Sequence, residues 1–263
     1  MANKIQRVNY HTHCERCRHA RGSAVEYVEE AVRANVSCLG FSDHMPFYDD
    51  RFGLRMPYEE LEDYLLEITA LREAYRDSLK LTRGFEGEYV REDNAYYEKL
   101  LSREDCDYLL LGQHFYEKAN GKLVNVYALK DTEDYEIYAG NIVEAMRTGY
   151  FRYAAHPDLI FLNEFSWDLH CDRACDIILD GAVRYGFALE YNANGFRRGK
   201  KQYPDGERYQ YPNDRFWEKV REAGISVYVG SDCHEPGQVY DKTVEAAYRK
   251  LEEMGIAFRT DWI

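Results

Sequence analysis

Near its amino terminus the chain reads His11-Thr12-His13-Cys14-Glu15-Arg16-Cys17-Arg18-His19. The preceding residues 5–10 alternate apolar and polar side chains, which predicts a short strand. Side chains two positions apart on a strand point the same way, so His11 and His13 project together from its end. Two imidazoles on one face, with His19 in the following loop, suit a transition-metal ion. A solvated pair would read the same way, so this interpretation depends on the other histidines.

The remainder of the chain alternates strand-like and helix-like segments. Strands are predicted at residues 37–41, 79–85, 107–111, 151–155, 187–190, 225–229 and 256–259. Helices are predicted at 23–35, 57–77, 92–101, 132–148, 172–185, 213–223 and 243–254, the first opened by a capping box of Ser23 and Glu26. This alternation predicts a parallel sheet with helices outside it. An open doubly wound sheet and a closed barrel both fit the alternation.

Polar residues at the strand ends distinguish these two architectures. Metal-binding residue types follow the carboxyl ends of different strands: His11, His13, His44, Glu86, His114, His156, Glu190, Asp232 and His234. A β/α barrel gathers all such ends around one mouth, whereas an open sheet spreads them along a line. We therefore predict a barrel, formed by a single domain over residues 1–263. The long connections at residues 91–134 and 191–211 are predicted to wall a pocket.

The number of candidate ligands sets the kind of metal site. Of the 8 histidines, only His170 lies away from the strand ends and the first loop, and we interpret it as a surface residue. A structural role would explain any one of the others but does not account for all of them. With Glu86 and Asp232, these histidines outnumber the ligands that one tetrahedral ion can take. Two or three divalent ions are therefore expected. Mixed nitrogen and oxygen donors leave zinc, manganese and iron open.

Composition narrows the class of protein. The chain has 263 residues, 45% of them hydrophobic, and no long apolar run, so we expect no membrane span. Its start lacks an apolar signal core, which favours the cytoplasm. The 7 cysteines are odd in number and unevenly spaced, so no disulfide framework is predicted, and Cys14 and Cys17 are interpreted as packing residues or as support for the ligands. A net charge of −13 argues against a nucleic-acid surface.

The order of these motifs resembles the polymerase and histidinol phosphatase (PHP) superfamily. The matching motifs are His11-Thr12-His13, Asp43-His44, Glu86, His114, His156 and Asp232-Cys233-His234. The resemblance covers essentially the whole chain. It implies a distorted (β/α)7 TIM-like barrel of parallel strands with a trinuclear metal centre at the carboxyl ends.

The resemblance also implies how the ligands divide among three ions. The first ion would be held by His11, His13, Glu86 and Asp232. The second would be held by Glu86, His114 and His156. The third would be held by His19, His44 and His234. Glu86 and Asp232 are the carboxylates expected to bridge ions, and with His234 they are the residues expected to act in catalysis.

Finer motifs are similar to the histidinol-phosphate phosphatase branch of this superfamily. They include Ser42-Asp43-His44-Met45-Pro46, His156-Pro157-Asp158-Leu159-Ile160 and Glu190-Tyr191-Asn192. The sequence departs from the branch at Gly112-Gln113-His114 and at Gly87-Glu88. The resemblance implies hydrolysis of L-histidinol phosphate, a small phosphate ester, to L-histidinol and phosphate in histidine biosynthesis. A hydroxide bridging two metals would be the nucleophile, and Arg197, followed by Arg198, would bind the phosphoryl group.

Two alternatives stay open at this point. One is a PHP-type phosphoesterase that acts on another small ester, on a nucleotide or on nucleic acid. The acidic charge balance weighs against the nuclease. The other is a non-catalytic metal-binding protein, which the presence of both Glu86 and Asp232 disfavours.

Overall fold

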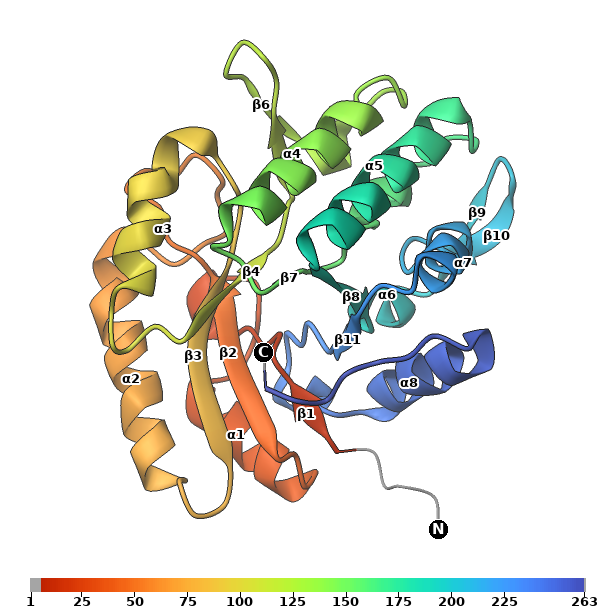
Figure 1. The fold of residues 1–263 in the computed structure, drawn as a ribbon. Helices are drawn as coiled ribbons and strands as arrows, with labels where there is room; N and C mark the ends of the chain where they lie inside the picture. Colours follow the sequence, from red (N-terminus) through yellow and green to blue (C-terminus); the bar gives the residue numbers. More distant parts are fainter. Residues whose placement is uncertain (1–5, 263) are drawn as a thin grey trace.

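The computed structural model describes residues 6–262 and shows a nearly closed β/α barrel (Figure 1). Seven parallel strands pair in the order β1-β2-β3-β4-β7-β8-β11. Their bounds are β1 Val8–Asn9, β2 Cys38–His44, β3 Lys80–Gly87, β4 Tyr108–Leu111, β7 Tyr153–Ala154, β8 Ala188–Asn192 and β11 Val227–Gly230. A parallel bridge between Thr12 and Cys233 joins the segments that follow the first and the last strand. The predicted barrel is confirmed.

Helices cover the outside of the barrel (Figure 1). They are α1 Ala24–Arg33, α2 Leu61–Ala74, α3 Asn94–Leu101, α4 Tyr135–Thr148, α5 Leu169–Tyr185, α7 Asp214–Ala223 and α8 Lys242–Met254. The capping box of Ser23 and Glu26 opens α1 as predicted. Short 3-10 turns occur at η1 Glu15–Cys17, η2 Tyr58–Glu60, η3 Arg91–Asp93, η4 Val126–Ala128, η5 Leu159–Leu162 and η6 Pro236–Gln238.

The structure differs from the sequence prediction in the two long connections and near the carboxyl terminus. The long connections contain two antiparallel hairpins, β5 Phe115–Glu117 with β6 Leu123–Asn125 and β9 Lys200–Tyr203 with β10 Gly206–Tyr209, and a short helix α6 Asn194–Arg197. The strand predicted at residues 256–259 is wrong, because only Phe258 makes a single bridge, to Val227. The first residue of the strand predicted at 5–10 lies outside the described residues.

A small apolar cluster fills the barrel interior. Its buried side chains all come from the barrel strands or their immediate ends: Val8, Tyr10, Cys38, Tyr108, Leu110, Tyr153, Ala188 and Tyr228. The hydroxyl of Tyr108 donates to the carbonyl of Tyr10 at 2.8 Å, and those of Tyr10 and Tyr153 donate to the carbonyl of Asp261 and to Glu190. The barrel is thus packed rather than hollow, and the strand-end residues described next lie at its mouth.

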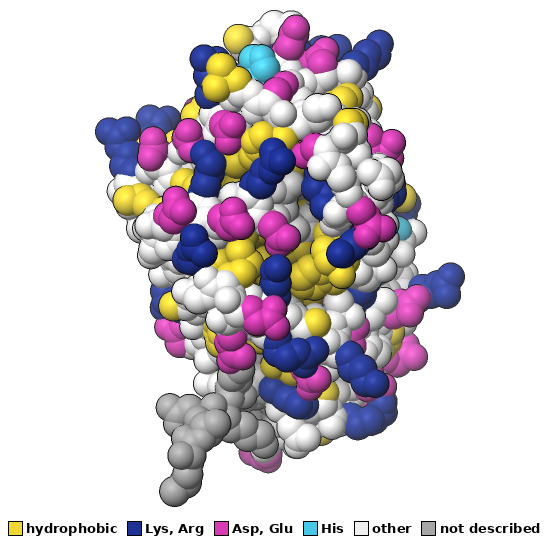
Figure 2. Space-filling view, turned by 90° about the vertical axis from the view of Figure 1, so that its right-hand side faces the viewer, with side chains coloured by type: hydrophobic (Ala, Val, Ile, Leu, Met, Phe, Trp, Pro, Cys, Tyr) yellow, Lys and Arg dark blue, Asp and Glu magenta, His cyan; other side chains and the backbone are white. Residues whose placement is uncertain are grey.

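The outer surface carries both signs of charge. On the face shown in Figure 2, Lys and Arg side chains are interspersed with Asp and Glu. In residues 6–262, no helix has both the length and the apolar character needed to cross a bilayer.

Candidate metal centre

Glu86, at the carboxyl end of β3, lies at the middle of the strand-end cluster. Its Oε2 atom is 3.5 Å from His11 Nε2, 3.4 Å from His13 Nε2 and 2.9 Å from His44 Nδ1. Its Oε1 atom is 2.8 Å from His156 Nε2 and 3.7 Å from His114 Nε2. One carboxylate therefore faces two separate groups of imidazoles, one with each oxygen.

Asp232 and the remaining histidines complete two further groups of donors. Asp232 Oδ1 is 3.3 Å from His13 Nε2 and 3.7 Å from His11 Nε2. His19 Nε2 is 3.0 Å from His234 Nε2. The donor atoms of His19, His44 and His234 all lie within 4.8 Å of one another. The structure thus brings together all nine residues predicted as ligands, whereas His170 lies apart, at the start of α5 against Glu136.

Several donor atoms of the cluster lack a hydrogen-bond partner or face another donor nitrogen. Glu86 Oε2 and His44 Nδ1 have no hydrogen-bond partner among the described residues, although they lie close together. Imidazole nitrogens also face one another, at 3.1 Å between His11 Nε2 and His13 Nε2. Buried polar atoms without partners are costly unless a cation neutralises and satisfies them. The residues therefore fit divalent transition-metal ions.

The two acidic ligand candidates are ionised in this setting. Burial opposes the charge of Glu86, but His11, His44 and His114 hold its pKa well below the usual range. Burial likewise opposes the charge of Asp232, and His11 and His13 outweigh it, so that its pKa is also well below the usual range. Carboxylates bind cations in the ionised form, so both groups are available as ligands.

A cavity of about 560 Å³ opens over the cluster. The candidate ligands His19, His44, His114, His156, Asp232 and His234 contribute to its lining. Its other walls carry Arg198 and aromatic side chains: Phe52, Phe115, Tyr127 and Tyr211. The cavity therefore leaves these candidate ligands open to a small molecule.

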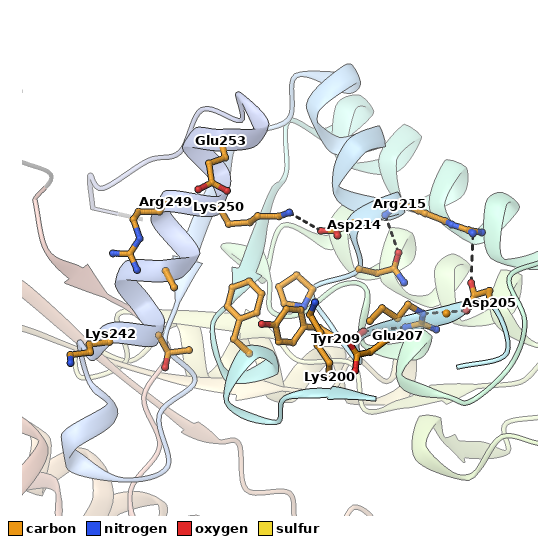
Figure 3. A pocket seen from close by; sticks show the side chains of 17 residues that line it. Lys200, Asp205, Glu207, Tyr209, Asp214, Arg215, Lys242, Arg249, Lys250 and Glu253 are labelled. Carbon is orange, nitrogen blue, oxygen red and sulfur yellow. Dashed lines mark hydrogen bonds and ion pairs between the residues drawn. The ribbon is translucent and has the colours of Figure 1, made fainter. Parts of the chain in front are cut away.

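A larger cavity, of about 700 Å³, lies between the hairpin β9–β10 and the helices α7 and α8 (Figure 3). Some of its charged side chains pair with each other, as in Lys250 with Asp214 at 3.4 Å and Arg215 with Asp205 at 3.7 Å. None of the nine candidate ligands lines it. The chemistry therefore belongs to the smaller cavity at the barrel mouth.

Comparison with known proteins agrees with this geometry. Residues 9–194 match the PHP domain family. The chain belongs to the PHP domain family. It is 30% identical over 254 residues to the probable histidinol-phosphatase of Deinococcus radiodurans, covering 93% of this chain and 92% of the relative. It is 24% identical over 264 residues to the histidinol-phosphatase of Bacillus subtilis, covering 89% of this chain and 96% of that one.

A solved structure extends the likeness of this PHP domain to the whole fold. The histidinol phosphate phosphatase of Lactococcus lactis, complexed with zinc, L-histidinol and phosphate, superposes with a TM-score of 0.73 at 16% identity. The match covers 97% of this chain and 96% of the other. At this level of identity the agreement concerns the fold.

Three further carboxylates orient the ligand candidates, and sequence reasoning did not assign them this role. Glu190 lies 2.9 Å from His11 Nδ1, Asp43 lies 3.3 Å from His13 Nδ1, and Glu88 lies 2.8 Å from His114 Nδ1. A carboxylate on one ring nitrogen fixes the tautomer and turns the other nitrogen toward the metal. The available signals were the strand-end position of Glu190 and the two-residue spacing of Glu88 from Glu86.

The local backbone is adapted to the site at four positions. His156 and Asp232 have φ angles of 33° and 47°, values that residues other than glycine rarely adopt. Such backbone strain concentrates at functional sites, where the surrounding structure holds it in place. Gly112 and Gly230 lie against the carboxylates of Glu86 and Glu190, where a Cβ atom would collide. Glycine at these two positions lets both carboxylates reach the cluster.

The structure places the two arginines differently from the expectation that Arg197 is the first phosphate-binding residue. The Arg197 guanidinium donates to Asp241 Oδ2 at 3.0 Å, to Ser231 Oγ at 2.9 Å and to the carbonyl of Gln238 at 3.0 Å. It therefore ties α6 to the residue before Asp232 and does not line the cavity. Arg198 lines the cavity, lies over the ring of Tyr211, and forms no ion pair within the described residues.

Proposed function

We propose that this PHP domain is a metal-dependent phosphatase that hydrolyses L-histidinol phosphate to L-histidinol and phosphate. The observation that carries the proposal is the position of Glu86, whose two oxygens face two separate groups of histidines at the mouth of the barrel. Relatives in Deinococcus radiodurans and Bacillus subtilis bear the name histidinol-phosphatase, and they span nearly the same length. The Lactococcus lactis protein of the same fold binds L-histidinol and phosphate together with zinc.

Three ions are proposed, and Glu86 belongs to the ligand sets of two of them. The first set is His11, His13, Glu86 and Asp232. The second is Glu86, His114 and His156. The third contains His19, His44 and His234. Bound ions of this kind supply an acidified water and withdraw charge from phosphoryl oxygens. Zinc is the metal we propose first, because it is the ion in the Lactococcus lactis complex and suits imidazole donors.

The side chains of the chain itself prepare the site for this chemistry. Burial and the neighbouring His13 lower the pKa of His234 to about 4, so its ring is neutral at neutral pH and can act as a ligand. Glu86 and Asp232 remain ionised and offset the charge of the cations. We propose that Arg198 binds the phosphoryl oxygens, since it lines the cavity and is not paired with a carboxylate among the described residues.

The cavity walls suit the organic part of the proposed substrate. The rings of Phe52 and Phe115 lie 5.2 Å apart, both along the cavity above the ligand candidates. Aromatic faces of this kind stack on a planar ring such as imidazole. We also propose that residues 1–263 act as one catalytic domain. We place the protein in the cytoplasm, because all seven cysteines are free thiols, which fits a reducing compartment.

Hydrolysis assays on a panel of substrates test the proposal. The purified metal-loaded protein is given L-histidinol phosphate, other phosphate monoesters, nucleotides, a generic aryl phosphate and single-stranded DNA. We expect the highest kcat/KM for L-histidinol phosphate. Phosphate release from another ester but not from L-histidinol phosphate would overturn the substrate assignment while leaving a phosphatase. A lack of turnover on every compound would instead favour the non-catalytic metal-binding protein.

A further inference from the structure

Cys17 lies beside the third set of candidate ligands, although the sequence pattern assigns it no metal. It ends the turn η1 and is fully buried. Its Sγ atom is 3.9 Å from His19 Nε2. The sulfur also lies within 4.8 Å of donor nitrogens of His13 and His234. Arg18, between the two residues, has a left-handed φ of 66°, and this turn brings the side chains of Cys17 and His19 to the same centre.

The surroundings of the Cys17 sulfur resemble those of a metal-bound thiolate. The backbone N–H of Ala20 donates to Sγ at 3.4 Å. Hydrogen bonds of this kind stabilise the charge on ligating sulfurs. Among the described residues, the other two cysteines near the centre point elsewhere. Cys14 Sγ donates to Asp43 Oδ2 at 3.1 Å, and Cys233 Sγ is 3.7 Å from Asn9 Nδ2 and 3.9 Å from the carbonyl oxygen of His11.

Two donor spacings at His19 are close to those around a tetrahedral zinc ion. Zinc bonds of the usual length give a nitrogen-to-nitrogen edge of roughly 3.3 Å and a nitrogen-to-sulfur edge of roughly 3.6 Å. The corresponding distances are 3.0 Å between His19 Nε2 and His234 Nε2 and 3.9 Å between His19 Nε2 and Cys17 Sγ. His44 belongs to the same group of donors as His19 and His234. The Cys17 sulfur borders this group through His19, at 3.9 Å, and through His234, whose donor nitrogen lies within 4.8 Å of it.

We propose that Cys17 is a thiolate ligand of the ion held by His19, His44 and His234. The metal–sulfur bond forms as the thiol proton passes to solvent, so binding releases one proton at this residue. A sulfur donor favours zinc, cobalt or iron over manganese, which prefers oxygen. Cys17 thereby makes this ion the most selective of the three. The proposal depends on the metal centre and is independent of the identity of the substrate.

Cobalt spectroscopy tests the sulfur–metal bond directly. The metal-free protein is titrated with Co²⁺, and near-ultraviolet absorption reports charge transfer from thiolate to cobalt. We expect this band in the wild-type protein and its loss in Cys17→Ser. The matched control Cys14→Ser changes a buried cysteine of the same loop and should keep the band. A wild-type protein that binds cobalt without the band overturns the proposal even if the variants do not fold, and so does a band that persists in Cys17→Ser.

A comparison of zinc and manganese binding gives a second test, which distinguishes a ligand role of Cys17 from a packing role. Zinc and manganese affinities are measured with the metals alone, in the wild type and in Cys17→Ser. We expect the zinc affinity of one site to fall about ten- to hundredfold, with manganese affinity nearly unchanged. An equal loss for both metals would assign Cys17 to packing and overturn the proposal. Because no substrate is present, neither result depends on whether L-histidinol phosphate is hydrolysed.

Discussion

Glu190 contacts His11 on the ring nitrogen opposite the metal-facing one. Its Oε1 atom lies 2.9 Å from His11 Nδ1, and both side chains are fully buried. The same carboxylate accepts hydrogen bonds from the backbone N–H of His156 and from Asn192. Nδ1 of His11 is thereby occupied, and Nε2 is directed at Glu86 and Asp232. Glu190 thus positions residues from two of the proposed metal sets without being a ligand itself.

Replacing Glu190 with glutamine should chiefly weaken metal binding. Glu190→Gln keeps the size of the side chain but removes the charge that makes His11 a strong donor. Loss of such an orienting carboxylate typically costs about ten- to hundredfold in metal affinity or activity. Metal titration and steady-state kinetics measure the two effects. Glu29→Gln, an exposed change on α1, is the control. Wild-type metal affinity in Glu190→Gln would remove Glu190 from this role.

Removing the metals should abolish activity and lower the melting temperature without unfolding the barrel. The converging donors lose the cations that neutralise them, while the tyrosine-rich barrel interior is unaffected. A ligand present at a hundred times its Kd stabilises by about 2.7 kcal/mol. For a domain of this size that corresponds to a melting temperature lower by roughly 5–10 °C. Calorimetry before and after chelation, with zinc added back, measures it. Full activity after thorough chelation would contradict the metal centre.

Glu86→Gln should remove metal as well as turnover. Glu86 faces two groups of histidines with its two oxygens, and a neutral amide bridges cations poorly. We expect the loss of at least one metal ion per chain and a collapse of kcat. Elemental analysis together with kinetics measures both. A variant with full metal content and nearly normal kcat would show that Glu86 does not bridge ions.

Asp158 should make the stability of the fold depend on pH. Its Oδ2 accepts hydrogen bonds from the backbone N–H of Asn213 and from Trp217 Nε1, while burial raises its pKa to about 6. Because the folded pKa exceeds the unfolded value, the folded state binds the proton more tightly. Its stabilising contribution is therefore complete below about pH 4 and is lost as pH rises through about 6.

The variant Asp158→Asn lacks the titrating carboxyl, so comparison with it isolates the contribution of Asp158 to stability from that of other titrating groups. Between pH 5 and pH 7 the free energy of unfolding of the wild type should fall by about 1 kcal/mol more than that of Asp158→Asn. Denaturant unfolding of both metal-free proteins at the two pH values measures the difference. Parallel pH profiles for the two proteins would show that Asp158 does not titrate in this range.

The barrel and the ligand cluster were predictable because both follow from local patterns. Strands of period two place His11 beside His13, and parallel strands bring all their carboxyl ends to one mouth. Both hairpins were missed although their turns carry recognisable signals. Asn120-Gly121 joins β5 to β6, and Pro204-Asp205-Gly206 joins β9 to β10. The sequence prediction treated both connections as loops and therefore did not include these turns.

Features that depend on tertiary contacts could not be predicted from the sequence. The direction of the Arg197 side chain depends on Asp241, a partner far along the chain at the start of α8. The Cys17 sulfur meets His234 only because the barrel closes. The strand predicted at residues 256–259 fails because Phe258 alone pairs with β11, so the apolar pattern there reflects packing against helix α8 instead.

The two adjacent arginines should respond differently to substitution. Arg198→Ala removes a cavity-facing cation, and charge-assisted hydrogen bonds to a phosphoryl group are worth about 1.5–3 kcal/mol. At roughly 1.4 kcal/mol per factor of ten, kcat/KM should fall about ten- to hundredfold, with metal content and melting temperature unchanged. Arg197→Ala instead breaks the contacts with Asp241, Ser231 and Gln238, so it should lower the melting temperature and disturb Asp232. Kinetics, elemental analysis and thermal unfolding of both variants measure the contrast. If Arg198→Ala kept wild-type kinetics while Arg197→Ala lost only substrate affinity at full stability, Arg197 would be the phosphate-binding residue.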